Sequence, residues 1–124
     1  MQHPQPSQSE IISHIKGIEN VHCVLPDPGK TLEFNTRLFG PPSHTDGDWS
    51  EFKISGFDFA VTRGESTKFV ITFKVKGLGE LCELLEERLA ARLSIQHGDY
   101  GDYVEVCPGN GFCLHFFEAK KRDK

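Results

Sequence analysis

Two histidines, His22 and His115, are the residues of this sequence that are best suited to chemistry. A neutral imidazole can bind a divalent metal or transfer a proton, so the pair predicts a metal site or a general acid–base pair. The alternative is two half-buried histidines that bond to neighbouring groups or touch a bound ligand. A metal site usually needs a third protein ligand, and the sequence offers no evident one. The pattern therefore favours the second interpretation.

Other candidate side chains lie on neighbouring predicted strands. Asp58 is a possible base if it is buried, but a carboxylate on a sheet face is more often solvated. Thr72 and Lys74 alternate along one strand and share a face, where Lys74 would pair with Asp58, contact an anionic ligand or face solvent. Trp49 follows a loop and is the best candidate for stacking on a ligand. Packing in the core or in an interface explains that tryptophan equally well.

The four cysteines are Cys23, Cys82, Cys107 and Cys113. None of them forms a CxxC pair, and a chain of this size with a hydrophobic core does not need disulfides. We therefore expect small thiols that are buried or half-buried.

The composition is that of one globular domain. The 124 residues suffice for one core and are too few for two ordinary domains. Ten phenylalanines suggest a sheet-rich core or an apolar cavity. The net charge of −4, with acids and bases interleaved, argues against a partner such as nucleic acid or an anionic membrane. No apolar run approaches the roughly 18 residues of a membrane span, and residues 1–10 do not resemble a signal peptide. The expected location is the cytoplasm.

Hydrophobic periodicity predicts two similar successions of elements, after a short helical turn within residues 10–16. The first has a strand at 18–25, a helix at about 30–39, a weak edge strand near 41–47, and strands at 49–55 and 57–62. The second has a strand at 68–75, a leucine-rich helix from about 78 to 89, and strands at 93–96, 102–107 and 112–118.

This succession is an internal repeat with a period of roughly fifty residues, which is a stronger signal than any single element. We predict an α+β fold in which two βαβββ repeats, at about 18–64 and 68–118, form a curved mixed sheet with helices outside. Residues 1–16 are expected to be a flexible extension, 17–119 the domain and 120–124 a basic tail.

Three stretches in this order resemble the glyoxalase/bleomycin-resistance/extradiol-dioxygenase superfamily, also called the vicinal oxygen chelate superfamily. They are IENVHCVLPDPGKTLEFNTRLFG, DWSEFKISGFDFAV and GDYGDYVEVCPGNGFCLHFFE, and the resemblance covers about residues 18–118. The resemblance implies the same fold. It also implies one divalent metal inside the curved sheet, held by His or Glu on the first strand of each repeat and on the last strand of the second.

The resemblance places these metal positions on residues that do not suit a metal. Counting from the motifs gives Asn20 and Val70 as the first two positions. The third is Leu114 if the closing turn matches residue for residue, or Cys113 if one residue is missing, and the second register is preferred because Cys113 and His115 then face inward. The symmetry of the two repeats places the remaining metal position on Asp58. Val cannot ligate and Asn is a poor ligand.

We therefore expect a domain that binds a small, partly apolar organic molecule in the cleft of the sheet without the usual metal. The expected ligand-binding residues are Asn20, His22, Trp49, Asp58, Thr72, Cys113 and His115. The alternative is a metal-dependent lyase, isomerase or dioxygenase with a displaced site that uses His22 and His115. A third possibility is a structural or regulatory subunit. Resemblance also implies a homodimer.

Overall fold

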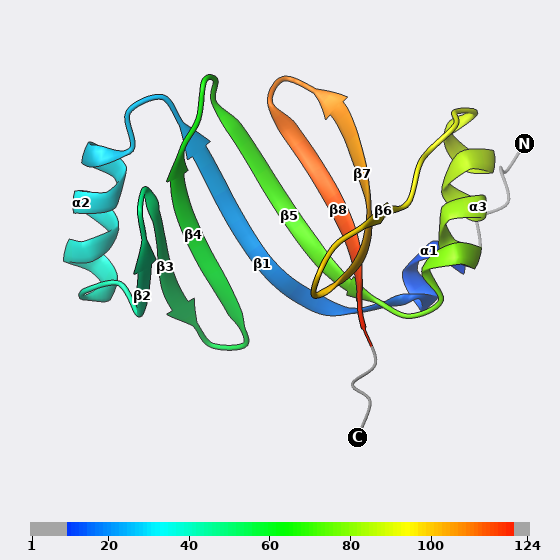
Figure 1. The fold of residues 1–124 in the computed structure, drawn as a ribbon, viewed down its shortest axis with the longest axis horizontal. Coiled ribbons are helices and arrows are strands. Elements are labelled where there is room, and N and C mark those ends of the chain that lie inside the picture. The colour runs from blue at the N-terminus through cyan, green and yellow to red at the C-terminus, as the bar shows by residue number, and fades with distance from the viewer. Residues whose placement is uncertain (1–9, 121–124) are drawn as a thin grey trace, which may run out of the picture.

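The computed structural model describes residues 10–120, so residues 1–9 of the expected extension and residues 121–124 of the expected tail lie outside the described part. The helices are α1 (Glu10–Ser13), α2 (Gly29–Phe39) and α3 (Leu78–Leu89) (Figure 1). The strands are β1 (Ile15–Leu25), β2 (His44–Asp46), β3 (Trp49–Ile54), β4 (Phe57–Arg63), β5 (Lys68–Val75), β6 (Gln96–His97), β7 (Gly101–Gly109) and β8 (Phe112–Ala119).

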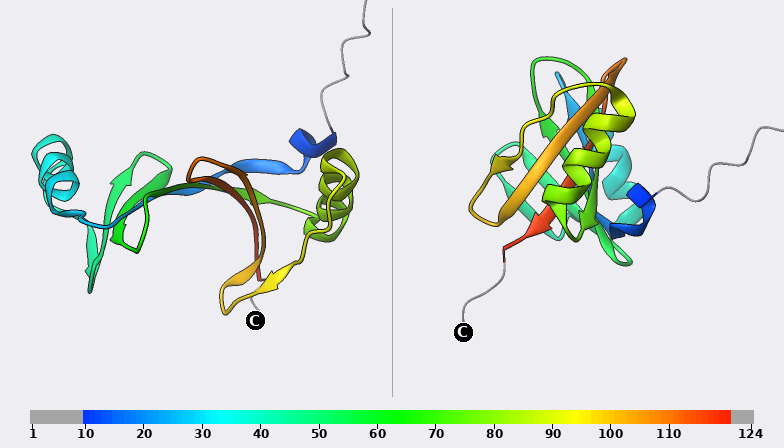
Figure 2. Two further views of the ribbon diagram at one scale, coloured as in Figure 1. Left: turned by 90° about the horizontal axis from the view of Figure 1, so that it is seen from above. Right: turned by 90° about the vertical axis from the view of Figure 1, so that its right-hand side faces the viewer.

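The strands form one eight-stranded sheet in the order β2-β3-β4-β1-β5-β8-β7-β6. The sheet is strongly curved (Figure 2). Within each repeat the first strand pairs in parallel with the last, as β1 does with β4 and β5 with β8. The two repeats join at the centre, where β1 and β5 are antiparallel. The helices lie at the outer ends, with α2 beyond β2 and with α1 and α3 together at the opposite end (Figure 1). The predicted α+β fold of two βαβββ repeats is confirmed.

Strand register aligns one row of polar side chains across five strands. Asn20 on β1 lies opposite Asp58 on β4 and Thr72 on β5. Thr72 in turn lies opposite His115 on β8, and His115 lies opposite Glu105 on β7. Because side chains alternate between the two faces of a sheet, residues in one such row project to the same face. Four of the predicted ligand-binding residues, Asp58, Asn20, Thr72 and His115, thereby lie in one row.

The main core lies between the second repeat and α3. Leu78, Leu81 and Leu85 of α3 are almost fully buried, as their helical spacing predicted. They form a cluster with Cys82 of the same helix and with residues on the sheet face opposite the polar row, namely Val75, Val104 and Phe116. The helix begins after Gly77, whose φ of 75° suits glycine. Glu118 anchors it, because its carboxylate accepts the backbone N–H groups of Gly77 and Leu78, each at 2.9 Å.

The other helix, α2, is less embedded. Its last residue, Phe39, contacts Phe52 and Phe59 with ring centroids 6.0 and 6.5 Å apart. Phe34 and Leu38 remain 62% and 60% exposed. No helix in residues 10–120 has the length and apolar character needed to span a bilayer.

Three expectations about element boundaries and packing need correction. The domain begins before residue 17, because α1 and the start of β1 fall within residues 10–16, and Ile11 and Ile15 pack against the α3 cluster. The strand expected at 93–96 is instead β6, shifted to 96–97. The phenylalanine content suggested a sheet-rich core or an apolar cavity, but Phe69 and Phe112 are 47% and 37% exposed.

Candidate functional site

A cavity of about 330 Å³ lies along the polar row. Three strands supply the predicted residues that line it: Asn20 and His22 from β1, Thr72 from β5 and His115 from β8. Trp49, the first residue of β3, also lines it. The remaining lining residues are Glu19, Tyr100, Tyr103 and Phe117. The structure thus brings five of the seven predicted ligand-binding residues to one cavity.

Aromatic rings follow one another along this cavity. The Trp49 and His22 ring centroids are 5.5 Å apart, and those of His22 and His115 are 6.5 Å apart. Tyr103 stacks on His115 at 5.0 Å with an interplanar angle of 23°. The indole Nε1–H of Trp49 donates to Glu51 at 2.7 Å, which fixes the orientation of the ring. The surface is therefore suited to the faces of a flat, largely apolar molecule.

His22 is held in its neutral form. Burial of the ring, followed by the nearby His115 and Lys68, lowers the pKa of His22 from 6.5 to about 4, against an opposing effect of Glu105. Its Nδ1 and the Oδ1 of Asn20 are buried and have no hydrogen-bond partner among residues 10–120. A buried polar atom without a hydrogen-bond partner lowers the stability of the fold by roughly 1–3 kcal/mol. Such unsatisfied atoms are therefore uncommon in folded proteins.

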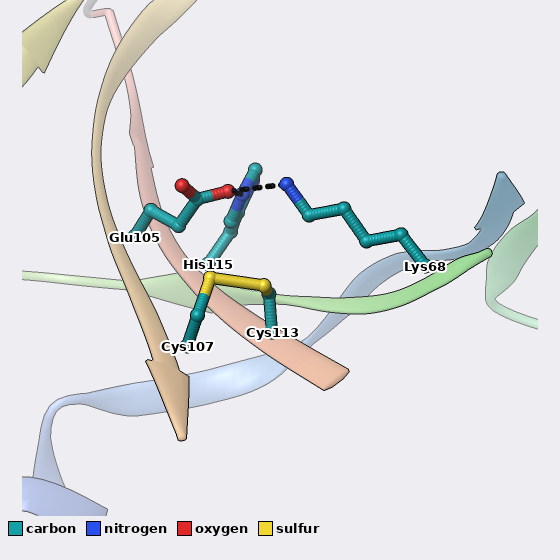
Figure 3. Close-up of polar contacts among 5 residues, drawn as sticks. All are labelled: Lys68, Glu105, Cys107, Cys113 and His115. Atoms are coloured by element: carbon teal, nitrogen blue, oxygen red, sulfur yellow. Dashed lines mark hydrogen bonds and ion pairs between the residues drawn. A yellow bond between two sulfur atoms is a disulfide. The ribbon is translucent and has the colours of Figure 1, made fainter. Parts of the chain in front are cut away.

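His115 belongs to a charged cluster at one side of the cavity (Figure 3). Its Nε2 lies 2.7 Å from Oε2 of Glu105, and the Lys68 ammonium lies 3.0 Å from the same oxygen. The hydrogen bond from His115 lowers the pKa of Glu105, and Lys68 acts in the same direction while burial opposes both. The cluster fixes the His115 ring beside Tyr103.

Asp58 does not line this cavity. It borders a separate pocket of about 260 Å³, together with Lys53 and Lys74. Lys74 makes its ion pair with Glu19 at 3.7 Å, rather than with Asp58 as considered above.

Cys113 is also absent from the cavity lining; it is buried and forms a disulfide with Cys107. The expectation of four thiols is wrong for this pair and holds for the buried Cys23 and Cys82. The separation of six residues between these cysteines does not by itself predict that they pair. An irregularity in register after Val106 and the turn before Phe112 bring the two cysteines to a Cα–Cα distance of 4.1 Å.

The structure does not fit a metal held at the superfamily positions. Asn20 offers only an amide, and Val70 is a buried apolar residue with no donor atom. The sulfur of Cys113 is bonded to Cys107. Leu114 packs against the α3 cluster, which favours the register that places Cys113 on the inner face. His22 and His115 are not part of any group of three His, Cys, Asp or Glu ligands within the described chain.

Sequence reasoning missed the tyrosines and Phe117. Tyr103 occupies the inward phase of β7, since Val104 on the same strand belongs to the core cluster on the other face. The alternation of side chains along β7 is sufficient to predict that Tyr103 faces inward. The position of Tyr100 could not be predicted in this way, because Tyr100 lies in the loop before β7.

Comparison with known proteins shows that this chain resembles several solved structures in fold. No protein-family model and no curated protein matches the chain. Among solved structures, a superfamily member from Vibrio splendidus 12B01, described as a glyoxalase/bleomycin resistance protein/dioxygenase, matches with TM-score 0.64 and 13% identity over 82% of this chain and 98% of that one. Methylmalonyl-CoA epimerase from Mycobacterium tuberculosis matches with TM-score 0.59 and 12% identity over 86% and 90%.

A variant of homoprotocatechuate 2,3-dioxygenase from B. fuscum matches with TM-score 0.62 and 18% identity over 90% of this chain. The match covers 34% of the dioxygenase, so this chain spans about a third of that enzyme. Identities this low establish the fold and leave the activity open.

Proposed function

Because this chain has the vicinal oxygen chelate fold without metal ligands at the usual positions, we propose that it binds a small, flat, partly apolar organic molecule in the cavity along β1, β5 and β8. The carrying observation is the run of rings from Trp49 through His22 and His115 to Tyr103. Aromatic walls with a few polar groups are typical of small-molecule sites. No bound metal is required for this function.

The polar groups indicate which ligand features would be recognised. Asn20, His22 and Thr72 supply an amide, a neutral imidazole and a hydroxyl to the same cavity. The unpartnered Oδ1 of Asn20 and Nδ1 of His22 gain partners if these side chains rotate toward a ligand that bears a hydroxyl or amine. An aromatic molecule with such a substituent therefore fits better than a plain hydrocarbon.

Trp49 provides the assay, because it is the single tryptophan of the chain and lines the cavity. We would titrate the protein with homoprotocatechuate, methylmalonyl-CoA and a panel of substituted phenols and indoles, and follow tryptophan emission. Saturable quenching by an aromatic compound is expected, with loss of binding in His22→Ala and His115→Ala. His44→Ala is the matched control, because His44 is exposed on β2.

The competing function is a metal-dependent enzyme with a displaced site. Its two imidazoles, His22 and His115, are neighbours at 6.5 Å. Metal analysis of protein purified without chelator decides between the two functions. A stoichiometric divalent metal that is lost in both His22→Ala and His115→Ala would refute metal-independent binding. Aromatic ligands whose affinity is unchanged in these variants would refute binding in this cavity.

A homodimer and a cytoplasmic location complete the proposal. The dimer rests on resemblance to the superfamily, and α2 presents Phe34 and Leu38, apolar surface of the kind that interfaces bury.

A further inference from the structure

A second cluster of reactive side chains lies on the β7–β8 hairpin. Glu105, Cys107 and Cys113 place a carboxylate oxygen and two sulfur atoms within 4.8 Å of one another. This is the one group of three or more His, Cys, Asp or Glu ligands found within residues 10–120. None of the three lines the cavity of the proposed function. The cluster therefore calls for a separate explanation.

In the structure the two cysteines form a disulfide, and they become metal ligands only after reduction. A cellular dithiol supplies this step, and a reducing cytosol favours it. The Cys107–Cys113 S–S bond breaks, the reductant is oxidised to its own disulfide, and the two cysteines gain two electrons and two protons. The product is a pair of adjacent thiols beside Glu105.

We propose that the reduced Cys107 and Cys113 bind one Zn²⁺ together with Glu105. Two Zn–S bonds form, and the two thiols release their protons to solvent. Thiolate sulfur and carboxylate oxygen are both ordinary zinc ligands. Three protein ligands leave the fourth position of a tetrahedral ion open to water or a solute.

Neighbouring side chains hold the carboxylate ligand in place. His115 and Lys68 both contact Oε2 of Glu105, at 2.7 and 3.0 Å, and Figure 3 shows these contacts beside the disulfide. Both contacts use the same oxygen, which leaves Oε1 available. Partners of this kind orient a metal ligand and raise the affinity of its site. The Lys68 ammonium also offsets the negative charge that two thiolates and a carboxylate carry in excess of Zn²⁺.

This site differs from the metal position of the superfamily. Cys113 falls on one of the usual positions, but Glu105 and Cys107 come from β7, which supplies none of them. None of the three zinc ligands lines the aromatic cavity, and the two sites share only His115, which supports Glu105. Its success or failure leaves the proposed ligand binding untouched.

Co²⁺ is the probe for the first experiment, because cobalt–thiolate sites absorb light where Zn²⁺ sites do not. The full chain is reduced with a phosphine, freed of reductant without oxygen, and titrated with Co²⁺. We expect one Co²⁺ per chain with thiolate-to-cobalt charge-transfer absorption, and its displacement by Zn²⁺. Oxidised protein should bind no stoichiometric Co²⁺. Absence of these bands in reduced wild-type protein overturns the proposal, and this comparison needs no substitution.

Variants then identify the ligands. Cys107→Ser and Cys113→Ser should abolish the charge-transfer bands, and His115→Gln should weaken binding by about 10–100-fold. Cys82→Ala is the matched control, because Cys82 is a free thiol in the α3 core. Far-UV circular dichroism checks that each variant is folded. Unchanged cobalt binding in Cys107→Ser, or equal loss in Cys82→Ala, overturns the assignment.

Discussion

Acidification should destabilise the fold through His22. The pKa of this ring is 6.5 in an unfolded chain and about 4 in the folded protein, chiefly because the ring is buried. Between these two values the unfolded state binds a proton that the folded state does not. The free energy of unfolding therefore falls as the pH drops from about 6.5 to about 4, and this contribution is constant above and below that window.

The size of this effect follows from the two pKa values. At about 1.4 kcal/mol for each pH unit, the difference between 6.5 and about 4 corresponds to roughly 3 kcal/mol. The ring lies at a cavity wall and is only partly removed from solvent, so we reduce the expected loss to about 2 kcal/mol. This is a substantial part of the stability of a small domain, which is about 5–15 kcal/mol.

Urea unfolding of oxidised protein at several pH values between 7.5 and 4 measures this loss. Glu105 also contributes, because its lowered pKa makes its stabilisation disappear as the pH falls toward and below the ordinary carboxyl value. Comparison with His22→Gln isolates the histidine, since the variant should lack the part of the slope between pH 6.5 and 4. His44→Gln serves as an exposed control.

Two results would refute this reasoning. One is an equal loss of stability on acidification in the wild type and in His22→Gln. The other is an NMR titration in which the His22 ring of the folded protein has a midpoint near 6.5. Either result would mean that the ring is open to water and that the cavity wall is looser than the structure indicates.

Four further predictions concern stability and assembly. Glu118→Ala should lower the free energy of unfolding measured in urea by about 1–2 kcal/mol, because two backbone N–H groups at the start of α3 lose their acceptor. Glu87→Ala is the control and should change this free energy little. Gly79→Ala should raise the free energy of unfolding by about 0.5 kcal/mol, because Gly79 lies in α3 and a Cβ there would meet no other atom within 4 Å. Gly111→Ala should destabilise by about 1 kcal/mol or more, because φ is +76° and the new Cβ would lie 2.7 Å from the Thr67 carbonyl. Light scattering after size exclusion should give the mass of a dimer, and a monomeric mass contradicts the proposed homodimer.

Periodicity in the sequence predicted the elements and their faces. The leucines of α3 recur at helical spacing and are buried, and the hairpin turn at Asn110 and Gly111 has the positive φ angles that such residues favour. The internal repeat predicted that two βαβββ units share one sheet. These features are local or periodic, so a single sequence is sufficient to recognise them.

The tertiary structure decided which inward-facing residues meet. A strand has a side-chain period of two, so a slip of two residues keeps every face and changes every neighbour. Register placed Thr72, rather than Val70, opposite Asn20. Asp58 also lies opposite Asn20 but borders a different pocket. A local irregularity in β7 then joined Cys107 to Cys113. The sequence by itself determined which residues face the inner side of the sheet. Long-range pairing between strands determined which of them line the cavity and which two cysteines bond.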